Sequence, residues 1–458
     1  MMISLLAPLP GSAQVLDGEW RIATAHEGGG IEEGYADPGF ADSAWEAVRL
    51  PHLRHSTAEQ DTLWYRHHFS PDLPGLAQHP RSEAEWGRDL AGLERIILRF
   101  GGAFYRARVW LNGVELGLHE GYFQPFGFDV TDLLRPGDNV LAVRCRFPIE
   151  TGEFRRKTAV AGIFADWDCK PYPSAFYPNL PPPTQWTVPI GLWQPVSLHA
   201  TGPVLIESLN IFPTVINPDW QSGRAEAATL KVVAAVRNLA AEQQTAELAL
   251  NIAPHNFVER DGISLYKQTL NLAGNEHRTL EFNRTLPSPR LWFPWTHGEP
   301  HLYQAQLTIS TRSVQFSNKI AQDFGVRDVR AVIEPGRWEW HLNGRRIFPK
   351  GSNYVSDFYL NRVIPEGLRR DLDLARNANL DLLRVHAHIA PPDFYHLCDE
   401  LGVMVMCDFP LIWTYAFNLP PDDDIAFRAS VQAQVEDMVR LLGSHPGDLF
   451  TVRAIGGL

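Results

Sequence analysis

The chain has 458 residues, of which 45% are hydrophobic and 21% are charged, and its formal net charge is −12. This length exceeds a single hydrophobic core and predicts about three domains of roughly 100–200 residues each. The acidic balance, without any run of Lys and Arg, argues against nucleic acid or an anionic membrane as a partner.

The chain begins with Met1–Pro10, which has no basic residue and only a short apolar run. We interpret this segment as an extended strand instead of a secretory signal. The four cysteines, Cys145, Cys169, Cys398 and Cys407, have no C-x-x-C spacing, which argues against a structural zinc site. Reduced thiols fit a cytoplasmic protein, and no apolar run approaches the ~18–20 residues of a membrane span.

Residues 1–200 show the pattern of an all-β domain, with short strands separated by Gly, Pro and Asn-Gly turns. The strand Arg106–Leu111 is followed by Asn112-Gly113, a strong signal of a β-hairpin because both residues tolerate positive φ. Val140–Arg146 forms a further alternating strand. Strands at this spacing predict a jelly roll or a related β-sandwich.

Two further segments follow before the pattern changes. Residues 150–190 are irregular but rich in aromatic side chains, so we expect a functional loop instead of disorder. Residues 201–328 form a second β block, in which Thr229–Val236 and Thr245–Ile252 alternate between apolar and polar side chains. This pattern predicts an immunoglobulin-like β-sandwich.

From residue 329 onward, strands alternate with helices, which is typical of a parallel βα architecture. Apolar residues recur at helical spacing in three segments, and Pro365 marks the start of the first. The expected helices are Pro365–Asn377, Pro392–Leu401 and Phe427–Leu442, and the expected strands are Ile347–Gly351, Leu380–His388 and Val403–Asp408. We therefore expect residues 329–458 to form the N-terminal half of a (β/α)8 barrel.

Polar side chains gather at the end of the expected strand Leu380–His388. Arg384, His386 and His388 alternate, so we expect all three on one face, at the end of the barrel where active sites lie. An inward Arg can hold a carboxylate, and a His can hydrogen-bond ligand hydroxyls. In the alternative interpretation, Arg384 is a structural ion-pair partner and the histidines are core residues. A metal site at the two histidines has no supporting Asp or Lys motif.

Three further residues are candidates for the same site. Asp408 ends an apolar strand, where a carboxylate is costly unless it binds hydroxyls or a cation. We expect it on the ligand side, with a buried Arg384–Asp408 ion pair as the alternative. Asn353 and Tyr354 follow the expected strand Ile347–Gly351, so we expect both of them to line the same barrel mouth.

A series of motifs occurs in one order through all three regions. They are Leu63–Arg66, Val109–Gly113, Phe128–Thr131, Gly191–Val196, Leu291–Pro294, Pro300–Tyr303, Phe324–Arg327, Leu342–Gly344, Lys350–Tyr354 and Arg384–Asp408. Each motif is weak alone, but their order over about 400 residues resembles glycoside hydrolase family 2. That family contains β-galactosidases, β-glucuronidases, β-mannosidases and exo-β-glucosaminidases.

The resemblance implies an exo-β-glycosidase that removes terminal β-linked sugars with two carboxylates and retention, without a cofactor or metal. The implied partner is a carbohydrate substrate. The segments Lys350–Tyr354, Trp167-Asp168 and Cys407–Phe409 resemble the mannosidase and glucosaminidase members, and Ala387 stands where the galactosidase type has a histidine. In this resemblance Trp167 stacks on a sugar and Asp168 accepts hydrogen bonds from its hydroxyls; ordinary loop packing is the alternative.

The same resemblance leads us to expect no catalytic residue in this chain. In the family, the acid/base is the Glu of an Asn-Glu pair that follows a His-Pro-Ser element. Here Ser444–Gly447 resembles that element, but the spacing places the pair at Ile455-Gly456, and the nucleophile beyond Leu458. We therefore expect a polypeptide truncated within its barrel that lacks both catalytic glutamates and is inactive. A non-catalytic carbohydrate-binding protein is the alternative function.

Overall fold

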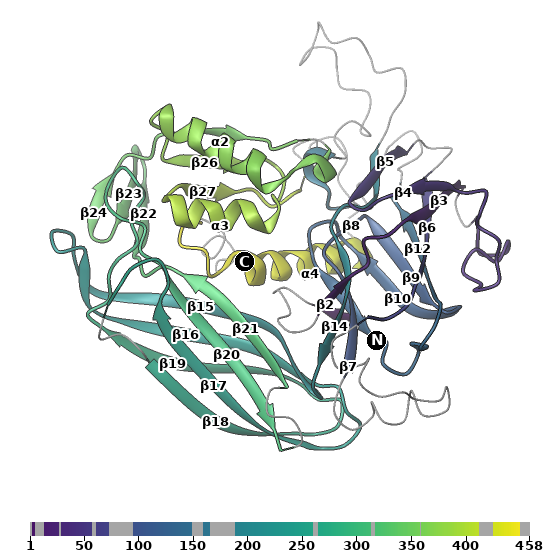
Figure 1. The fold of residues 1–458 in the computed structure, drawn as a ribbon. Coiled ribbons are helices and arrows are strands. Elements are labelled where there is room, and N and C mark those ends of the chain that lie inside the picture. The colour runs from purple at the N-terminus through teal and green to yellow at the C-terminus, as the bar shows by residue number, and fades with distance from the viewer. Residues whose placement is uncertain are drawn as a thin grey trace, which may run out of the picture.

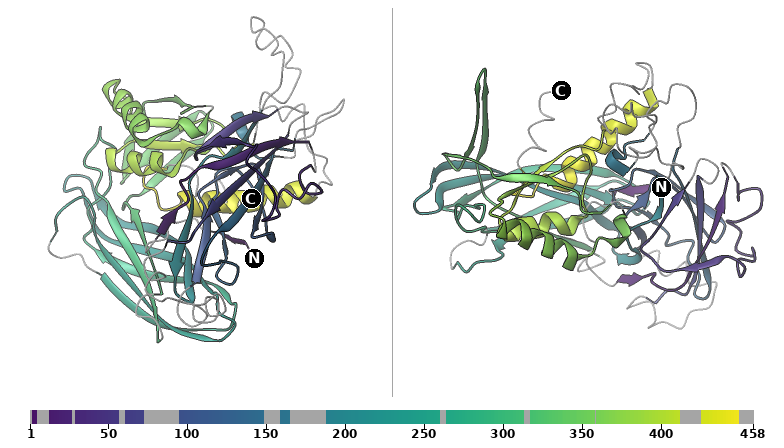
Figure 2. Two further views of the ribbon diagram at one scale, coloured as in Figure 1. Left: turned by 45° about the vertical axis from the view of Figure 1, so that its right-hand side comes forward. Right: turned by 90° about the horizontal axis from the view of Figure 1, so that it is seen from above.

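The structure is a computed structural model, which describes residues 2–4, 13–26, 29–56, 61–72, 95–148, 159–164, 188–259, 264–312, 317–357, 359–411 and 425–448. Figure 1 shows three groups of elements in chain order: N-terminal antiparallel sheets, a β-sandwich, and a βα part. The last helix runs between all three groups (Figures 1 and 2).

The N-terminal part is built from antiparallel sheets. Their strand orders are β1-β11-β7-β14-β2, β10-β9-β12-β6-β3-β4 and β5-β13-β8. The bounds are β1 (Met2–Ser4), β2 (Ala13–Val15), β3 (Trp20–Ala25), β4 (Glu46–Val48), β5 (His52–Ser56), β6 (Thr62–Phe69), β7 (Arg95–Phe100), β8 (Ala103–Phe104), β9 (Arg106–Leu111), β10 (Val114–Glu120), β11 (Phe126–Asp129), β12 (Asn139–Arg146), β13 (Val188–Leu192) and β14 (Val196–Thr201). The expected hairpin is confirmed: Asn112 and Gly113 join β9 to β10 with φ values of 52° and 82°.

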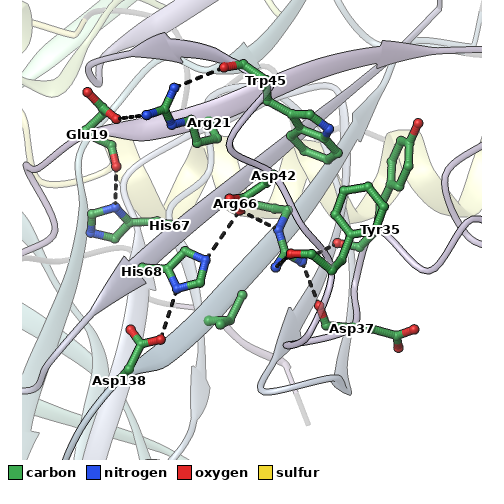
Figure 3. Close-up of polar contacts among 12 residues, drawn as sticks. Glu19, Arg21, Tyr35, Asp37, Asp42, Trp45, Arg66, His67, His68 and Asp138 are labelled. Atoms are coloured by element: carbon green, nitrogen blue, oxygen red, sulfur yellow. Dashed lines mark hydrogen bonds and ion pairs between the residues drawn. The ribbon is translucent and has the colours of Figure 1, made fainter.

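The motif Leu63–Arg66 lies on β6, and Arg66 fixes a long loop to the outside of its sheet (Figure 3). The Arg66 side chain is completely buried, and its Nε donates to Oδ2 of Asp42 at 2.7 Å. Its Nη1 donates to the carbonyl oxygens of Tyr35 at 2.6 Å and Asp37 at 3.0 Å. One buried guanidinium thus satisfies three oxygen atoms of the loop between β3 and β4, and Tyr35 of this loop packs edge-on against Trp64.

The second group is a β-sandwich of two antiparallel sheets, β15-β16-β19 and β18-β17-β20-β21. The bounds are β15 (Val204–Asp219), β16 (Arg224–Asn238), β17 (Gln244–Pro254), β18 (Ser264–Leu272), β19 (His277–Pro287), β20 (Tyr303–Thr311) and β21 (Asn318–Phe324). Alternate residues of the strands point into one shared core, as in Leu230, Val232, Leu248, Leu250 and Leu307. The period-2 pattern of the sequence is therefore realised as two packed sheets.

The third group begins with a small antiparallel sheet and continues as a parallel sheet with helices. The small sheet contains β22 (Val329–Glu334), β23 (Arg337–Leu342) and β24 (Arg345–Ile347). The parallel sheet contains β25 (Gly351–Tyr354), β26 (Leu382–Val385) and β27 (Met404–Cys407), and the helices are α2 (Pro365–Asn377), α3 (Pro392–Leu401) and α4 (Ile425–Leu442). Asp448 forms a parallel bridge to Val405 of β27. Within the described residues this sheet is open, not a closed barrel.

The expected strand Ile347–Gly351 is wrong. Ile347 ends β24, which pairs antiparallel with β23, and the first parallel strand is β25, which begins at Gly351. Pro349 lies between them and has no N–H to donate to a ladder, so it separates two strands that sequence alone had merged. Asn353 and Tyr354 consequently lie within a strand and not after it.

The expected strand Leu380–His388 is too long. Asn379 and Ala387 have positive φ values of 59° and 52°, so the backbone turns on both sides of β26. Helices α2 and α3 match the expected bounds Pro365–Asn377 and Pro392–Leu401, each with a proline in its first turn.

The buried Arg66 network gives a first prediction. We expect Arg66→Ala to lower the free energy of unfolding by roughly 3–5 kcal/mol, because it leaves Asp42 and two loop carbonyls without their donor. Urea unfolding followed by tryptophan fluorescence measures this change. The exposed Arg330, which pairs with Asp328 at 2.8 Å, supplies the control Arg330→Ala, expected within about 0.5 kcal/mol of wild type. Equal effects of the two substitutions would contradict the role of Arg66.

Candidate functional site

The candidate site lies at the carboxyl ends of β26 and β27, where Arg384 and Asp408 meet. Arg384 Nη2 donates to Asp408 Oδ2 at 2.7 Å, and Nε donates to Oδ1 at 3.1 Å, so the contact is bidentate. Their side chains are 41% and 24% exposed, so both remain within reach of a ligand. The ion pair of the alternative interpretation therefore exists, but it is not buried.

Two further polar groups lie close to one oxygen of the Asp408 carboxylate, Oδ2. The Ala387 N–H donates to Asp408 Oδ2 at 3.2 Å, and His386 Nδ1 lies 3.4 Å from the same oxygen. The left-handed conformation of Ala387 accompanies this contact. The Arg384 guanidinium and the Ala387 N–H thus hold the carboxylate in place with three hydrogen bonds, and the His386 ring lies beside them. A carboxylate fixed by donors on one side presents its remaining lone pairs to hydroxyls on the other.

His388 does not share a face with Arg384 and His386, and the expected alternation of these three residues is wrong. β26 ends at Val385, and the turn at Ala387 redirects the chain. His388 is completely buried, its Nδ1 lies 2.9 Å from the carbonyl oxygen of His386, and its ring packs edge-on against Phe164. Burial lowers the pKa of His388 to about 4, which keeps the ring neutral at neutral pH.

Asn353 and Tyr354 point to opposite sides of the sheet because both lie in β25. Asn353 pairs in register with Arg384 and is exposed. Tyr354 stacks on Phe394 of α3 at 4.9 Å between ring centroids, and its hydroxyl donates to Asp371 of α2 at 3.2 Å. The expectation that both residues line one mouth is therefore wrong for Tyr354, which packs beneath the helices.

Trp167 and Asp168 lie outside the described residues, but a described segment ends three residues before Trp167. This segment, residues 159–164, includes the 3-10 turn Gly162–Phe164. Its backbone is hydrogen-bonded to the strand ends: Gly162 N donates to Pro410 O at 2.9 Å, and Ile163 N donates to Ala387 O at 3.0 Å. The N-terminal part of the chain thus covers the carboxyl ends of β26 and β27.

Two tyrosines of the N-terminal sheets strengthen the same contact. The Tyr122 hydroxyl accepts from Ile389 N at 2.6 Å, and the Tyr105 hydroxyl accepts from the side chain of Gln434 on α4 at 2.9 Å. Sequence analysis did not single out these residues. The available signal was the apolar run Ala159–Phe164 within the irregular segment 150–190, because such a run needs a surface to cover it.

A second buried pair lies behind the site, at the end of α3. Asp399 Oδ2 lies 2.5 Å from His445 Nδ1, and Asp399 Oδ1 accepts from Gly447 N at 3.1 Å. Burial lowers the pKa of His445, the Asp399 carboxylate raises it, and the net direction is upward. Within the described ranges, His396, Asp399 and His445 are the one group whose potential metal ligands cluster within 4.8 Å. Both Asp399 oxygens are already engaged.

Two family sequence models match the chain. Residues 79–176 match the glycosyl hydrolase 2 galactose-binding domain-like model, and residues 210–327 match the model of glycosyl hydrolases family 2. The second range lies over the β-sandwich, and the first includes β7 to β12. Within the described ranges, no helix combines the length and apolar character needed to cross a membrane.

Relatives of known activity cover most of this chain. An exo-β-D-glucosaminidase of Hypocrea virens is 25% identical over 94% of the chain, and a β-mannosidase of Capra hircus is 27% identical over 78%. The crystal structure of an Amycolatopsis orientalis exo-chitosanase superposes with a TM-score of 0.70 and 21% identity, covering 96% of this chain. The chain spans 47%, 41% and 48% of these three proteins, less than half of each.

The contact of Gly162 with the strand ends can be tested by adding one carbon atom. A Cβ at Gly162 would lie 1.8 Å from the carbonyl oxygen of Ala387, and the φ of +52° is itself unfavourable for alanine. We expect Gly162→Ala to expose residues 159–164 and 386–389 to faster amide hydrogen exchange. Gly137→Ala is the matched control, because no heavy atom lies within 4 Å of its Cβ. Unchanged exchange in Gly162→Ala would contradict this contact.

The Asp399–His445 pair predicts a pH dependence of stability. The folded-state pKa of His445 is raised above 6.5, so its stabilisation is complete below pH 6.5 and is lost as the pH rises through the folded-state value. We expect Asp399→Asn to cost roughly 3–5 kcal/mol near pH 6 and less at alkaline pH. Urea titrations across this range measure the difference. A cost that is independent of pH would refute the pairing.

The control for this titration is Asp138→Asn. Asp138 contacts His68 at 3.0 Å, but the two side chains are 65% and 43% exposed, so little stabilisation is expected at any pH.

Proposed function

We propose that the βα part is built as a glycoside hydrolase site, because residues 79–176 match the glycosyl hydrolase 2 galactose-binding domain-like model and residues 210–327 match the model of glycosyl hydrolases family 2. Such a site removes terminal β-linked sugars from glycosides or oligosaccharides. The proposed domains are residues 1–200, 201–328 and 329–458. The second boundary lies in the gap between β21 and β22, and the first falls at the last residue of β14, just before the gap to β15.

The observation that carries the proposal is the polar cluster at the carboxyl ends of parallel strands. Arg384, Asp408 and Asn353 come from three adjacent strands, and catalysis in βα folds is located at this end. The contacts of Tyr354 with α2 and α3 identify the helix side of the sheet, so Asn353 and Arg384 face the opposite side. That side is the interior in a barrel.

Substrate recognition by this cluster follows from its hydrogen-bonding groups. Asp408 accepts from sugar hydroxyls, Asn353 both donates and accepts, and His386 adds the nitrogen atoms of an imidazole. Arg384 orients the carboxylate through two parallel hydrogen bonds, which fixes the direction of its free lone pairs. A monosaccharide with several adjacent hydroxyls fits such a set of alternating donors and acceptors.

Trp167 and Asp168 are proposed to complete this site. Phe164 packs against His388 at the strand ends, and three residues of extended chain span at most about 11 Å. The proposal places both side chains beside Asp408. The indole of Trp167 would cover the apolar face of a sugar, and the Asp168 carboxylate would accept from its hydroxyls.

The proposed chemistry is retaining hydrolysis by two carboxylates about 5–5.5 Å apart. In the resemblance, the acid/base position corresponds to Gly456, which cannot transfer a proton. We infer that this 458-residue polypeptide binds sugars without cleaving them. The alternative function, a non-catalytic carbohydrate-binding protein, also means binding without cleavage. Detectable hydrolysis by the chain would exclude that alternative.

The activity test uses the purified chain with nitrophenyl β-mannoside, β-galactoside and β-glucosaminide. We expect no release of nitrophenol above the buffer rate, because the position of the acid/base glutamate corresponds to Gly456. Turnover that disappears in Asp408→Asn would overturn this inference while supporting the site.

Sugar binding is tested separately by isothermal titration of the same chain with mannose, galactose and glucosamine. Asp408→Asn is expected to weaken binding by about 10- to 100-fold, since charged hydrogen bonds contribute roughly 1.5–3 kcal/mol. Tyr354→Phe is the matched control, expected to leave binding unchanged because its hydroxyl faces Asp371. Equal affinities of wild type and Asp408→Asn would exclude the site.

A further inference from the structure

A second feature lies far from the βα part, on the central strand of the five-stranded N-terminal sheet. Arg99 is on β7, between β11 and β14. Its neighbours Leu98 and Phe100 are completely buried in the core, so the Arg99 side chain leaves the sheet on the opposite, outer face. At one end of that face, Leu205 of the β-sandwich packs on Ile97.

Among the described residues, no acidic side chain forms an ion pair with Arg99, and nothing accepts a hydrogen bond from its buried Nε. Burial lowers the pKa of the Arg99 guanidinium to about 10. A guanidinium taken out of water is costly unless it is paired, so this residue has an unmet requirement for an anion.

The acidic residue nearest to Arg99 in the strand register is Asp129, and it does not pair with Arg99. Asp129 lies on β11, two residues from Gly127, which is the register partner of Arg99. The Asp129 carboxylate instead accepts from the Thr131 hydroxyl and lies 3.5 Å from Arg95. The acid on this face is therefore already engaged.

The strand neighbours of Arg99 are a glycine on one side and a serine on the other. Gly127 has no side chain to fill the position beside Arg99 on β11. On β14 the register partner is Ser197, which is 6% exposed and whose hydroxyl lies 2.7 Å from His199 Nε2. A guanidinium beside a hydroxyl matches the donor pattern that binds carboxylate, sulfate or phosphate groups.

We propose that Arg99, with Ser197 beside it, forms a binding site for a small oxyanion on the outer face of this sheet. The ligand class is a carboxylate, sulfate or phosphate group, carried either by an inorganic ion or by an acidic sugar. The site is independent of the proposed glycosidase site, because β7 and the ends of β26 and β27 belong to different sheets.

Thermal melting of the full chain tests the proposal, with sodium sulfate compared with sodium chloride at equal ionic strength. Sulfate stabilises most proteins by exclusion, so the decisive quantity is the difference between wild type and Arg99→Met. We expect sulfate to raise the Tm of wild type by about 2–4 °C more than that of Arg99→Met. Arg330→Met, at an exposed arginine paired with Asp328, should respond as wild type does.

Two outcomes would overturn the site: equal sulfate responses of wild type and Arg99→Met, or the same loss of response in Arg330→Met. If Arg99→Met does not fold, Arg99→Lys replaces it, and the lost guanidinium fork is expected to weaken the sulfate response at least threefold. An unchanged response in Arg99→Lys then rejects the site.

Parallel melts with glucuronate and glucose identify the source of the anion. A larger shift with glucuronate than with sulfate, and none with glucose, assigns an acidic sugar. A shift with sulfate alone assigns an inorganic oxyanion.

Discussion

The arrangement of this molecule depends on two backbone hydrogen bonds, from Gly162 to Pro410 and from Ile163 to Ala387. They join the N-terminal part of the chain to the carboxyl ends of parallel strands more than 200 residues later in the sequence. A glycine is required because a side chain would collide with the Ala387 carbonyl. The Tyr122 hydroxyl holds the next turn at Ile389, so the polar groups beyond β26 are fixed from outside their own sheet.

The charged groups serve different ends according to their burial. Arg66 is completely buried and satisfies the groups of one loop, and Asp399 with His445 anchors the residues that follow α4. Arg384 and Asp408 form an equally well-aligned pair but remain partly exposed. Buried pairs tolerate the loss of either partner poorly, whereas an exposed, oriented carboxylate can exchange water for ligand hydroxyls. Geometry and exposure together distinguish the proposed site from the structural pairs.

Sequence analysis predicted the elements whose signals are local and missed contacts that depend on distant residues. The helices Pro365–Asn377 and Pro392–Leu401 were predicted to the residue because each has a proline in its first turn and a regular apolar face. The first parallel strand was misplaced because the effect of Pro349 on the ladder was overlooked, and this error also put Tyr354 on the wrong face. His388 was misplaced because the left-handed turn at Ala387 has no local signature.

The most direct measurement of the central claim is a crystal structure of this chain soaked with mannose or glucosamine. The account predicts difference density for one sugar whose hydroxyls lie within hydrogen-bonding distance of the Asp408 carboxylate and Asn353, with Trp167 across its face. Density confined to another surface, or a Trp167 side chain directed away from the ends of β26 and β27, would contradict the account.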